Sequence, residues 1–170
     1  NLGINFFDTA NVYGWKMGEG ITEQIIGRWF AQGGQRREKT VIATKVYNDM
    51  GDWPNETRLS ALHIRRACED SLKRLKTDYI DLYQSHQDDP ATPIEETLGA
   101  YAKLIEQGKV RAIGASNFSA ARLGESLAIA KKYNLPRYES LQPEYNLVSR
   151  AGYEAELEAL VRKEDVGVIS

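Results

Sequence analysis

The sequence is poor in several features that mark other classes of protein. It holds one cysteine and two histidines among 170 residues, so we expect neither a disulfide framework nor a thiolate metal cluster. The formal net charge is −2 and the pI is near 5.8, which argues against non-specific binding to nucleic acid or to an anionic membrane. No apolar run approaches the ~18 to 20 residues that span a bilayer, and the first residues lack the basic-then-apolar pattern of a leader. We therefore expect a soluble, cytoplasmic protein.

What the sequence does contain is an alternation of apolar runs and amphipathic segments. Hydrophobic residues make up 42% of the chain, enough for the core of one domain. Five segments with helical periodicity lie between the runs, and strict alternation of strand and helix predicts right-handed parallel units. The runs that we interpret as six strands are Ile4–Phe7, Val41–Thr44, Ile80–Ser85, Val110–Ala115, Glu139–Leu141 and Val166–Ile169.

Local signals predict where several helices begin. Thr92, Pro93 and Glu95 form a helix start, with an N-cap hydroxyl, a proline at the first helical position and a capping-box glutamate. Gly108 ends that helix. Ser119 is the predicted cap of the helix that follows.

One amphipathic segment, residues 64–75, contains the only cysteine. Cys68 falls on its apolar stripe, and we expect it to be an inert core residue. His63, directly before these residues, lies in a helical segment without a partner motif, and we place it on the surface. Neither residue is therefore a candidate for chemistry.

A polar residue stands where each apolar run ends, at intervals close to the roughly 31 residues per unit of a ~250-residue barrel of eight strand–helix units. The carboxyl ends of barrel strands converge on one mouth. We predict an α/β fold in which residues 1–170 form one parallel TIM-barrel domain, with about six strands and five helices and hence incomplete at both ends. An open doubly wound sheet fits the alternation too, although no G-x-G-x-x-G follows a strand. The polar residues at the strand ends are Asp8, Lys45, His86, Ser116 with Asn117, and Gln142.

Asp8, Tyr13, Lys45 and His86 form a chemically coherent set. A tyrosine with its ordinary pKa near 10 is a poor acid or base at neutral pH. A lysine ammonium held beside a tyrosine favours the phenolate, and an aspartate beside the lysine keeps the ammonium charged and in place. A histidine at the same mouth can orient a carbonyl oxygen or share in proton transfer. Such a set suits carbonyl reduction, and it contains no activated serine or cysteine nucleophile.

Four segments resemble the aldo-keto reductase family. They run in order along the whole chain, with the spacing that the family shows. Asn5–Gly14, with the sequence NFFDTANVYG, is similar to the family's signature opening. The other three are Asp78–His86, Gly108–Ser119 and Gln142–Leu147, similar to its fourth, fifth and sixth strand regions.

The resemblance implies a role for each member of the set. Tyr13 would be the general acid in reduction and the general base in oxidation, assisted by Lys45 and Asp8. His86 would orient the carbonyl group. The implied reaction is hydride transfer from NADPH to an aldehyde, a ketone or a sugar-like carbonyl, without a metal, although NADH is not excluded.

The resemblance also implies binding residues. Ser116, Asn117 and Gln142 match the family positions that hydrogen-bond the nicotinamide carboxamide. Trp15 and Trp53 lie in loops after the strands that end in Asp8 and Lys45, where substrate walls form, although either tryptophan could instead anchor its loop.

Two other interpretations stay open. The chain could be a non-catalytic or redox-sensing barrel, as the channel beta-subunit relatives are, or an inactive truncated fragment. Family members have a further strand and helix before the position of Asn1, and a nicotinamide-stacking tyrosine and phosphate-gripping loops after that of Ser170. The sequence does not determine the substrate, the reaction direction, or whether the protein forms homo-oligomers.

Overall fold

The computed structural model describes residues 3–14 and 18–170. In that part of the chain, six parallel strands form one sheet in the order β1-β2-β3-β4-β5-β6, so that each strand pairs with the next along the sequence. Sequential order without a reversal is the arrangement of a barrel rather than of a doubly wound sheet. The strands are β1 (Phe6–Asp8), β2 (Val41–Val46), β3 (Ile80–Ser85), β4 (Val110–Ser116), β5 (Tyr138–Gln142) and β6 (Gly167–Val168).

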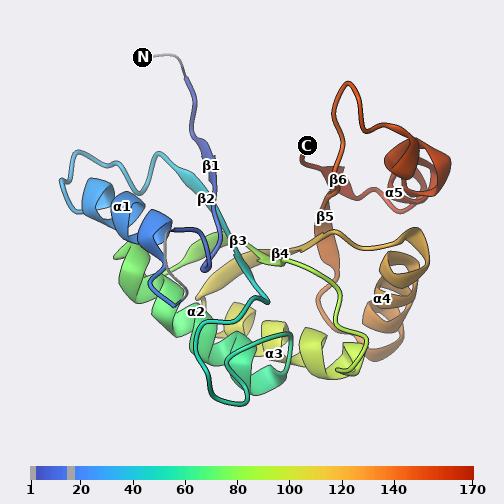
Figure 1. The fold of residues 1–170 in the computed structure, drawn as a ribbon, viewed down its shortest axis with the longest axis horizontal. Coiled ribbons are helices and arrows are strands. Elements are labelled where there is room, and N and C mark those ends of the chain that lie inside the picture. Colours follow the sequence, from blue (N-terminus) through green and yellow to red (C-terminus); the bar gives the residue numbers. More distant parts are fainter. Residues whose placement is uncertain (1–2, 15–17) are drawn as a thin grey trace.

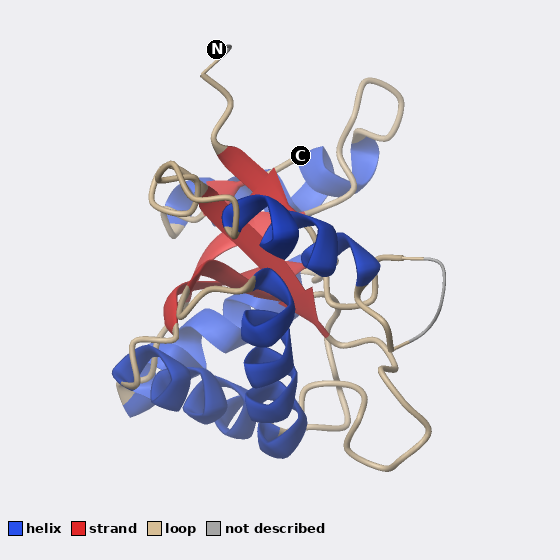
Figure 2. Cartoon of the chain, turned by 90° about the vertical axis from the view of Figure 1, so that its left-hand side faces the viewer, coloured by secondary structure: helices blue, strands red, loops and turns tan. Residues whose placement is uncertain are grey.

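The helices lie around the outer side of this curled sheet, from α1 at one edge to α5 at the other (Figure 1). Figure 2 shows that the long loops following the strands gather at one end of the molecule. The alternation of strand and helix makes the fold a partial TIM barrel, as the sequence predicts. None of the described helices is both long and apolar enough to cross a membrane. The helical segments are α1 (Ile21–Phe30), α2 (Ala61–Leu75), α3 (Ile94–Glu106), α4 (Ala120–Tyr133), the π-helical turn η1 (Tyr153–Leu157) and α5 (Glu158–Lys163).

The main core lies between the sheet and the helices. Ile42, Tyr83 and Ile113 on neighbouring strands have no exposed surface, and Leu98 of α3 and Leu123 of α4 are equally buried. Because side chains alternate across a strand, the residues next to these strand positions point to the inner side of the sheet. The apolar residues on the outer face of the sheet thus pack against the helices, and the positions on its inner face remain for polar side chains.

The helix ends confirm one predicted cap and correct another. Ser119 Oγ accepts a hydrogen bond from Arg122 N, 3.2 Å away, and caps α4 as expected. The predicted cap at Thr92 is wrong: α3 has no side-chain cap, and the Thr92 hydroxyl donates to Asp89 Oδ2 at 2.7 Å. The buried Asp89 carboxylate also accepts from Leu59 N, so it competes successfully with the helix end for the threonine.

Helix α2 bears out one expectation and overturns another. Cys68 is fully buried, and burial raises the pKa of its thiol to about 12, so it is an inert core residue. His63 is also buried, with 3% exposure, contrary to the surface position expected. The loop before α2 folds over this ring, and His63 Nδ1 lies 3.2 Å from the carbonyl oxygen of Asn55. Burial lowers the pKa of His63.

Candidate active site

The polar residues of the sequence motifs lie together at the carboxyl ends of the strands. Asp8 ends β1, Ser116 ends β4 and Gln142 ends β5, while His86 directly follows β3. Lys45 is the last residue but one of β2. These positions are far apart in sequence, and parallel pairing alone places them at neighbouring strand ends.

Lys45 forms the buried centre of this group. Its side chain is 2% exposed, and its ammonium nitrogen lies 2.6 Å from Asp8 Oδ2. The same nitrogen donates to the carbonyl oxygen of Thr9 at 2.9 Å. A buried ammonium needs such partners because desolvation of an unpaired charge is costly. The Asp8 side chain is more exposed, at 26%, so its carboxylate contacts both the buried ammonium and the solvent at the mouth.

Tyr13 and His86 lie beside this ion pair. The Lys45 nitrogen is 5.2 Å from the centroid of the Tyr13 ring. The Tyr13 and His86 ring centroids are 5.7 Å apart and the rings are nearly perpendicular, at 77°. The structure therefore brings the phenol, the ammonium, the carboxylate and the imidazole together, as the motifs predict.

The loop between β1 and α1 holds Tyr13 through its backbone. Tyr13 N donates to the carbonyl oxygen of Ala10 at 3.2 Å, and Thr22 donates to Tyr13 O from both its N and its Oγ1 at 3.1 Å. Gly14 follows with φ of 154°, and a Cβ there would lie 2.8 Å from Ile21 Cβ. The glycine is thus needed for the close approach of the Tyr13 loop to α1.

The environment of His86 keeps its ring neutral. Burial, together with the nearby Lys45 charge, lowers the pKa of His86 to about 4, although Asp8 acts in the opposite direction. Its backbone N donates to Val46 O at 3.0 Å, which extends the pairing of β3 with β2. His86 Nδ1 is buried and has no hydrogen-bond partner among the described residues. At neutral pH the ring is therefore an uncharged imidazole.

Ser116, Asn117 and Gln142 form a connected group next to His86. Ser116 Oγ and Asn117 N both donate to Gln142 O, at 3.0 and 3.2 Å. Asn117 Nδ2 donates to His86 O at 3.0 Å and to Ser116 Oγ at 3.2 Å. Asn117 adopts a left-handed backbone with φ of 57°, which asparagine tolerates better than most residues. These bonds fix the three candidate carboxamide-binding residues relative to one another and to His86.

Gln84, which the sequence motifs do not single out, also belongs to this group. Gln84 Nε2 donates to Asp8 Oδ1 at 3.2 Å and to Gln142 Oε1 at 3.3 Å. Gln142 Nε2 donates in turn to Asp8 Oδ2 at 3.2 Å. A signal was available, because Gln84 lies two positions before His86 and strand alternation puts both on the same face.

Trp53, one of the two candidate substrate tryptophans, does not join the group. Trp53 lies in the loop between β2 and α2 and is 78% exposed. Its backbone N donates to Glu56 Oε2 at 3.1 Å, and no hydrogen bond or ring contact joins it to the four central residues within 3–14 and 18–170. Trp15 lies outside the described residues.

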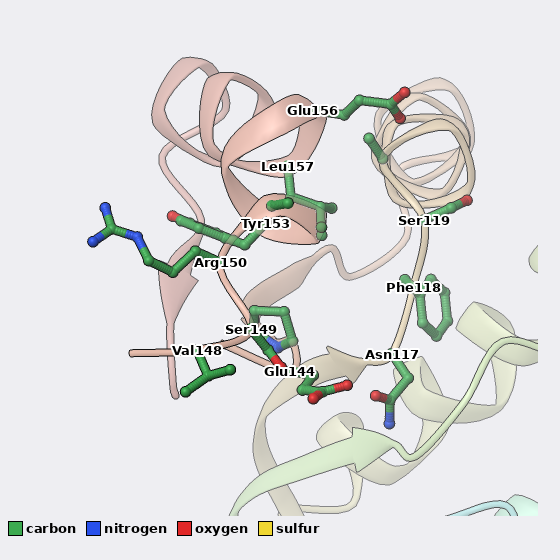
Figure 3. Close-up of a pocket in the computed structure, with 14 residues that line it drawn as sticks. Asn117, Phe118, Ser119, Glu144, Val148, Ser149, Arg150, Tyr153, Glu156 and Leu157 are labelled. Atoms are coloured by element: carbon green, nitrogen blue, oxygen red, sulfur yellow. The ribbon is translucent and has the colours of Figure 1, made fainter. Parts of the chain in front are cut away.

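A cavity of about 540 Å³ adjoins the mouth at Asn117. Figure 3 shows Asn117 and Glu144 on one side of it and Tyr153 and Leu157 on the other. The cavity lies between the loop after β4 and the segment that leads from β5 into η1. The residues that line it do not include Asp8, Lys45, Tyr13 or His86, so the cavity lies next to these four residues and not among them.

Comparison with known proteins identifies the family. A family model described as the aldo/keto reductase family matches residues 1–170. The chain is 49% identical over 170 residues to an uncharacterized oxidoreductase, YrpG, of Bacillus subtilis, covering 98% of this chain and 51% of the relative. It is 39% identical to a putative voltage-gated potassium channel subunit beta of Schizosaccharomyces pombe, covering 92% of this chain and 45% of that protein. It is 41% identical to the aldo-keto reductase YhdN of Bacillus subtilis, covering 87% of this chain and 41% of that protein.

The chain belongs to the aldo/keto reductase family, as the sequence motifs indicate. It spans about half the length of the curated relatives it matches.

Proposed function

We propose that the protein containing this chain is an oxidoreductase that reduces aldehydes or ketones to alcohols, with Tyr13 as the proton donor. The observation that carries this proposal is the position of the Lys45–Asp8 ion pair beside the Tyr13 ring, which in turn faces His86. Reduction of a carbonyl leaves negative charge on its oxygen, which must receive a proton. The phenol hydroxyl supplies that proton, and in the reverse direction the phenolate accepts it.

Lys45 assists this transfer by its charge. The phenol oxygen becomes negative when it gives up its proton, and an ammonium nitrogen 5.2 Å from the ring centroid stabilises that negative charge. Asp8 holds the ammonium in place at 2.6 Å. Because Lys45 is 2% exposed, water screens its field little.

His86 orients the substrate rather than supplying the proton. The lowered pKa of His86, about 4, means that its ring is neutral at physiological pH. A neutral imidazole donates one N–H hydrogen bond but is a weak acid. In this role an N–H of His86 holds the carbonyl oxygen close to the Tyr13 hydroxyl.

Ser116, Asn117 and Gln142 suit the carboxamide of a nicotinamide cofactor, which we take to be NADPH. When bound, the reduced nicotinamide supplies the hydride. A carboxamide offers one acceptor oxygen and two N–H donors. Asn117 uses its Nδ2 on His86 and Ser116, which leaves Oδ1 as an acceptor for an N–H. Gln142 Nε2 has a second N–H beyond the one given to Asp8, and that N–H can meet the carboxamide oxygen.

The activity is tested with the protein as its gene encodes it. Purified protein is mixed with NADPH or NADH and a panel of aldehydes and ketones, and loss of the reduced-nicotinamide absorbance is followed. We expect carbonyl-dependent oxidation of the cofactor, faster with NADPH than with NADH. Absence of carbonyl-dependent turnover with both cofactors and the whole panel contradicts the proposal.

A non-catalytic role is the second candidate, favoured by the 39% identity to a protein named as a potassium channel beta subunit. A subunit that only binds partners has no use for a proton donor. Cofactor binding without turnover of any carbonyl, in wild type and Tyr13→Phe alike, supports this candidate. The gathered Tyr13, Lys45, Asp8 and His86 favour the enzyme.

A further inference from the structure

The side-chain nitrogen of Gln84 contacts both the proton-transfer residues and the candidate cofactor-binding residues. Its side chain is completely buried, and Nε2 donates to Asp8 Oδ1 and to Gln142 Oε1 at 3.2 and 3.3 Å. The third side of the triangle is the bond from Gln142 Nε2 to Asp8 Oδ2 at 3.2 Å. Asp8 belongs to the proton-transfer group and Gln142 to the candidate cofactor group. Gln84 is therefore the side chain that joins them.

The sheet register makes room for this amide. Gln84 pairs with Lys45 on one side and with Gly114 on the other, and Gly114 pairs with Ser140. A Cβ at Gly114 would lie 3.1 Å from Gln84 Cγ and 2.4 Å from Ser140 Oγ. Because Gly114 has no side chain, the Gln84 chain can lie across it. The position of the Gln84 amide on β3 therefore depends on a glycine at position 114 of β4.

Burial of this amide has a cost that packing alone does not explain. A buried amide must form its hydrogen bonds to offset its loss of hydration. Gln84 forms two with its nitrogen, while its Oε1 is buried and has no partner in the described part of the chain. An apolar side chain of similar shape would fill this space without leaving an oxygen unpaired. The function of Gln84 therefore lies in what its nitrogen holds.

We propose that Gln84 is a positioning residue that sets the Asp8 carboxylate and the Gln142 amide relative to each other. Asp8 fixes the Lys45 ammonium beside Tyr13, so Gln84 influences proton transfer through Asp8. It also influences cofactor affinity through Gln142, because a bond to Oε1 determines which way the amide faces. This inference rests on the proposed function for its kinetic part, while its binding part is measured without turnover.

The test compares Gln84→Met with wild type in the protein as its gene encodes it. Methionine keeps the approximate shape and removes both hydrogen bonds. Cofactor affinity is measured by fluorescence titration with NADPH, hydride transfer by single turnover at saturating cofactor, and folding by the thermal unfolding midpoint. We expect NADPH affinity and the single-turnover rate each to fall roughly 10-fold, the size expected for losing a hydrogen bond to a polar or charged partner. The unfolding midpoint stays within a few degrees.

Two further variants separate positioning from packing. Gly114→Ala is made together with Ser140→Ala, because the added Cβ would lie 2.4 Å from Ser140 Oγ, and it then crowds Gln84 Cγ at 3.1 Å. This variant keeps the amide and displaces it, so it should reproduce both losses, and it also decides the matter if Gln84→Met does not fold. Gln32→Met removes an exposed glutamine in the turn after α1, outside the hydrogen-bonded group, and should change neither. A Gln84→Met protein with wild-type NADPH affinity and wild-type rate, or one in which only the unfolding midpoint falls, overturns the inference. If wild type reduces no carbonyl, the proposed function fails, while the NADPH titration still decides the role of Gln84.

Discussion

The Lys45 ammonium nitrogen lies 2.6 Å from Asp8 Oδ2, and this pair joins the last residue of β1 to the inner face of β2. Parallel pairing places Asp8 opposite Ala43, two residues before Lys45 and on the same face of β2, so the carboxylate lies within reach of the lysine side chain. Lys45 thereby holds its charge beside Tyr13 while remaining buried. The proposed proton transfer depends on this arrangement.

Lys45→Met should slow hydride transfer and destabilise the protein. The substitution removes the positive charge beside the phenol and leaves Asp8 without its ion-pair partner. We expect the unfolding free energy to fall by about 3 kcal/mol, as when one partner of a buried pair is removed. Chemical denaturation and single-turnover kinetics measure the two effects. Lys103→Met, at an exposed position on α3, is the matched control, and equal behaviour of the two variants counts against the role of Lys45.

His86 should titrate well below an ordinary histidine. Its pKa is lowered to about 4 in the folded state, whereas in the unfolded state it is near 6.5. Between these values the unfolded state binds more protons, so the stability contributed by neutral His86 is full above about pH 6.5 and declines as the pH falls toward about 4. NMR titration of the imidazole resonances, assigned with His86→Gln, measures this directly. An apparent pKa near 6.5 for His86 contradicts the described environment.

Gly14→Ala should damage both folding and activity. An added Cβ would lie 2.8 Å from Ile21 Cβ, on a backbone with φ of 154°, and overpacking of this kind typically costs about 1 to 3 kcal/mol. Relief of the clash moves the neighbouring Tyr13, so the rate should fall as well. Gly99→Ala is the control, because a Cβ there meets no atom within 4 Å. Unfolding midpoints and rates that are equal in both variants refute this explanation.

The 170 residues expressed by themselves should self-associate. Strand β1 pairs only with β2 and β6 only with β5 in the described sheet, and unpaired strand edges invite pairing with another chain. Phe6 on β1 and Val168 on β6 are both 40% exposed. Analytical ultracentrifugation of this segment should show oligomers or aggregates, with weak NADPH binding. A stable monomer that binds NADPH tightly is the opposite result.

The sequence was sufficient to predict the parallel barrel-type fold and the gathering of the strand-end residues. Each apolar run ends in a polar residue, and parallel strands place such residues at one edge, so Lys45, His86 and Gln142 could be assigned to one mouth without coordinates. The prediction needed only local patterns and one topological rule.

The residues that were missed or wrongly placed have partners outside their own helix or strand. Gln84 is held by Asp8 and Gln142, and no local pattern specifies the register of the strands that carry them. His63 is buried because a loop folds over α2 and brings the carbonyl group of Asn55 to its ring. Thr92 has the sequence context of a helix cap, yet a buried carboxylate takes its hydroxyl.

The central claim is that Tyr13 donates the proton to a carbonyl, and Tyr13→Phe tests it most directly. The substitution removes the hydroxyl and keeps the ring that faces His86 and Lys45. In the protein as its gene encodes it, single-turnover reduction of a carbonyl substrate at saturating NADPH should slow by about 100- to 10,000-fold, the usual value of general acid–base assistance. The NADPH dissociation constant should stay nearly unchanged. A Tyr13→Phe protein that reduces the substrate at the wild-type rate would show that another group supplies the proton.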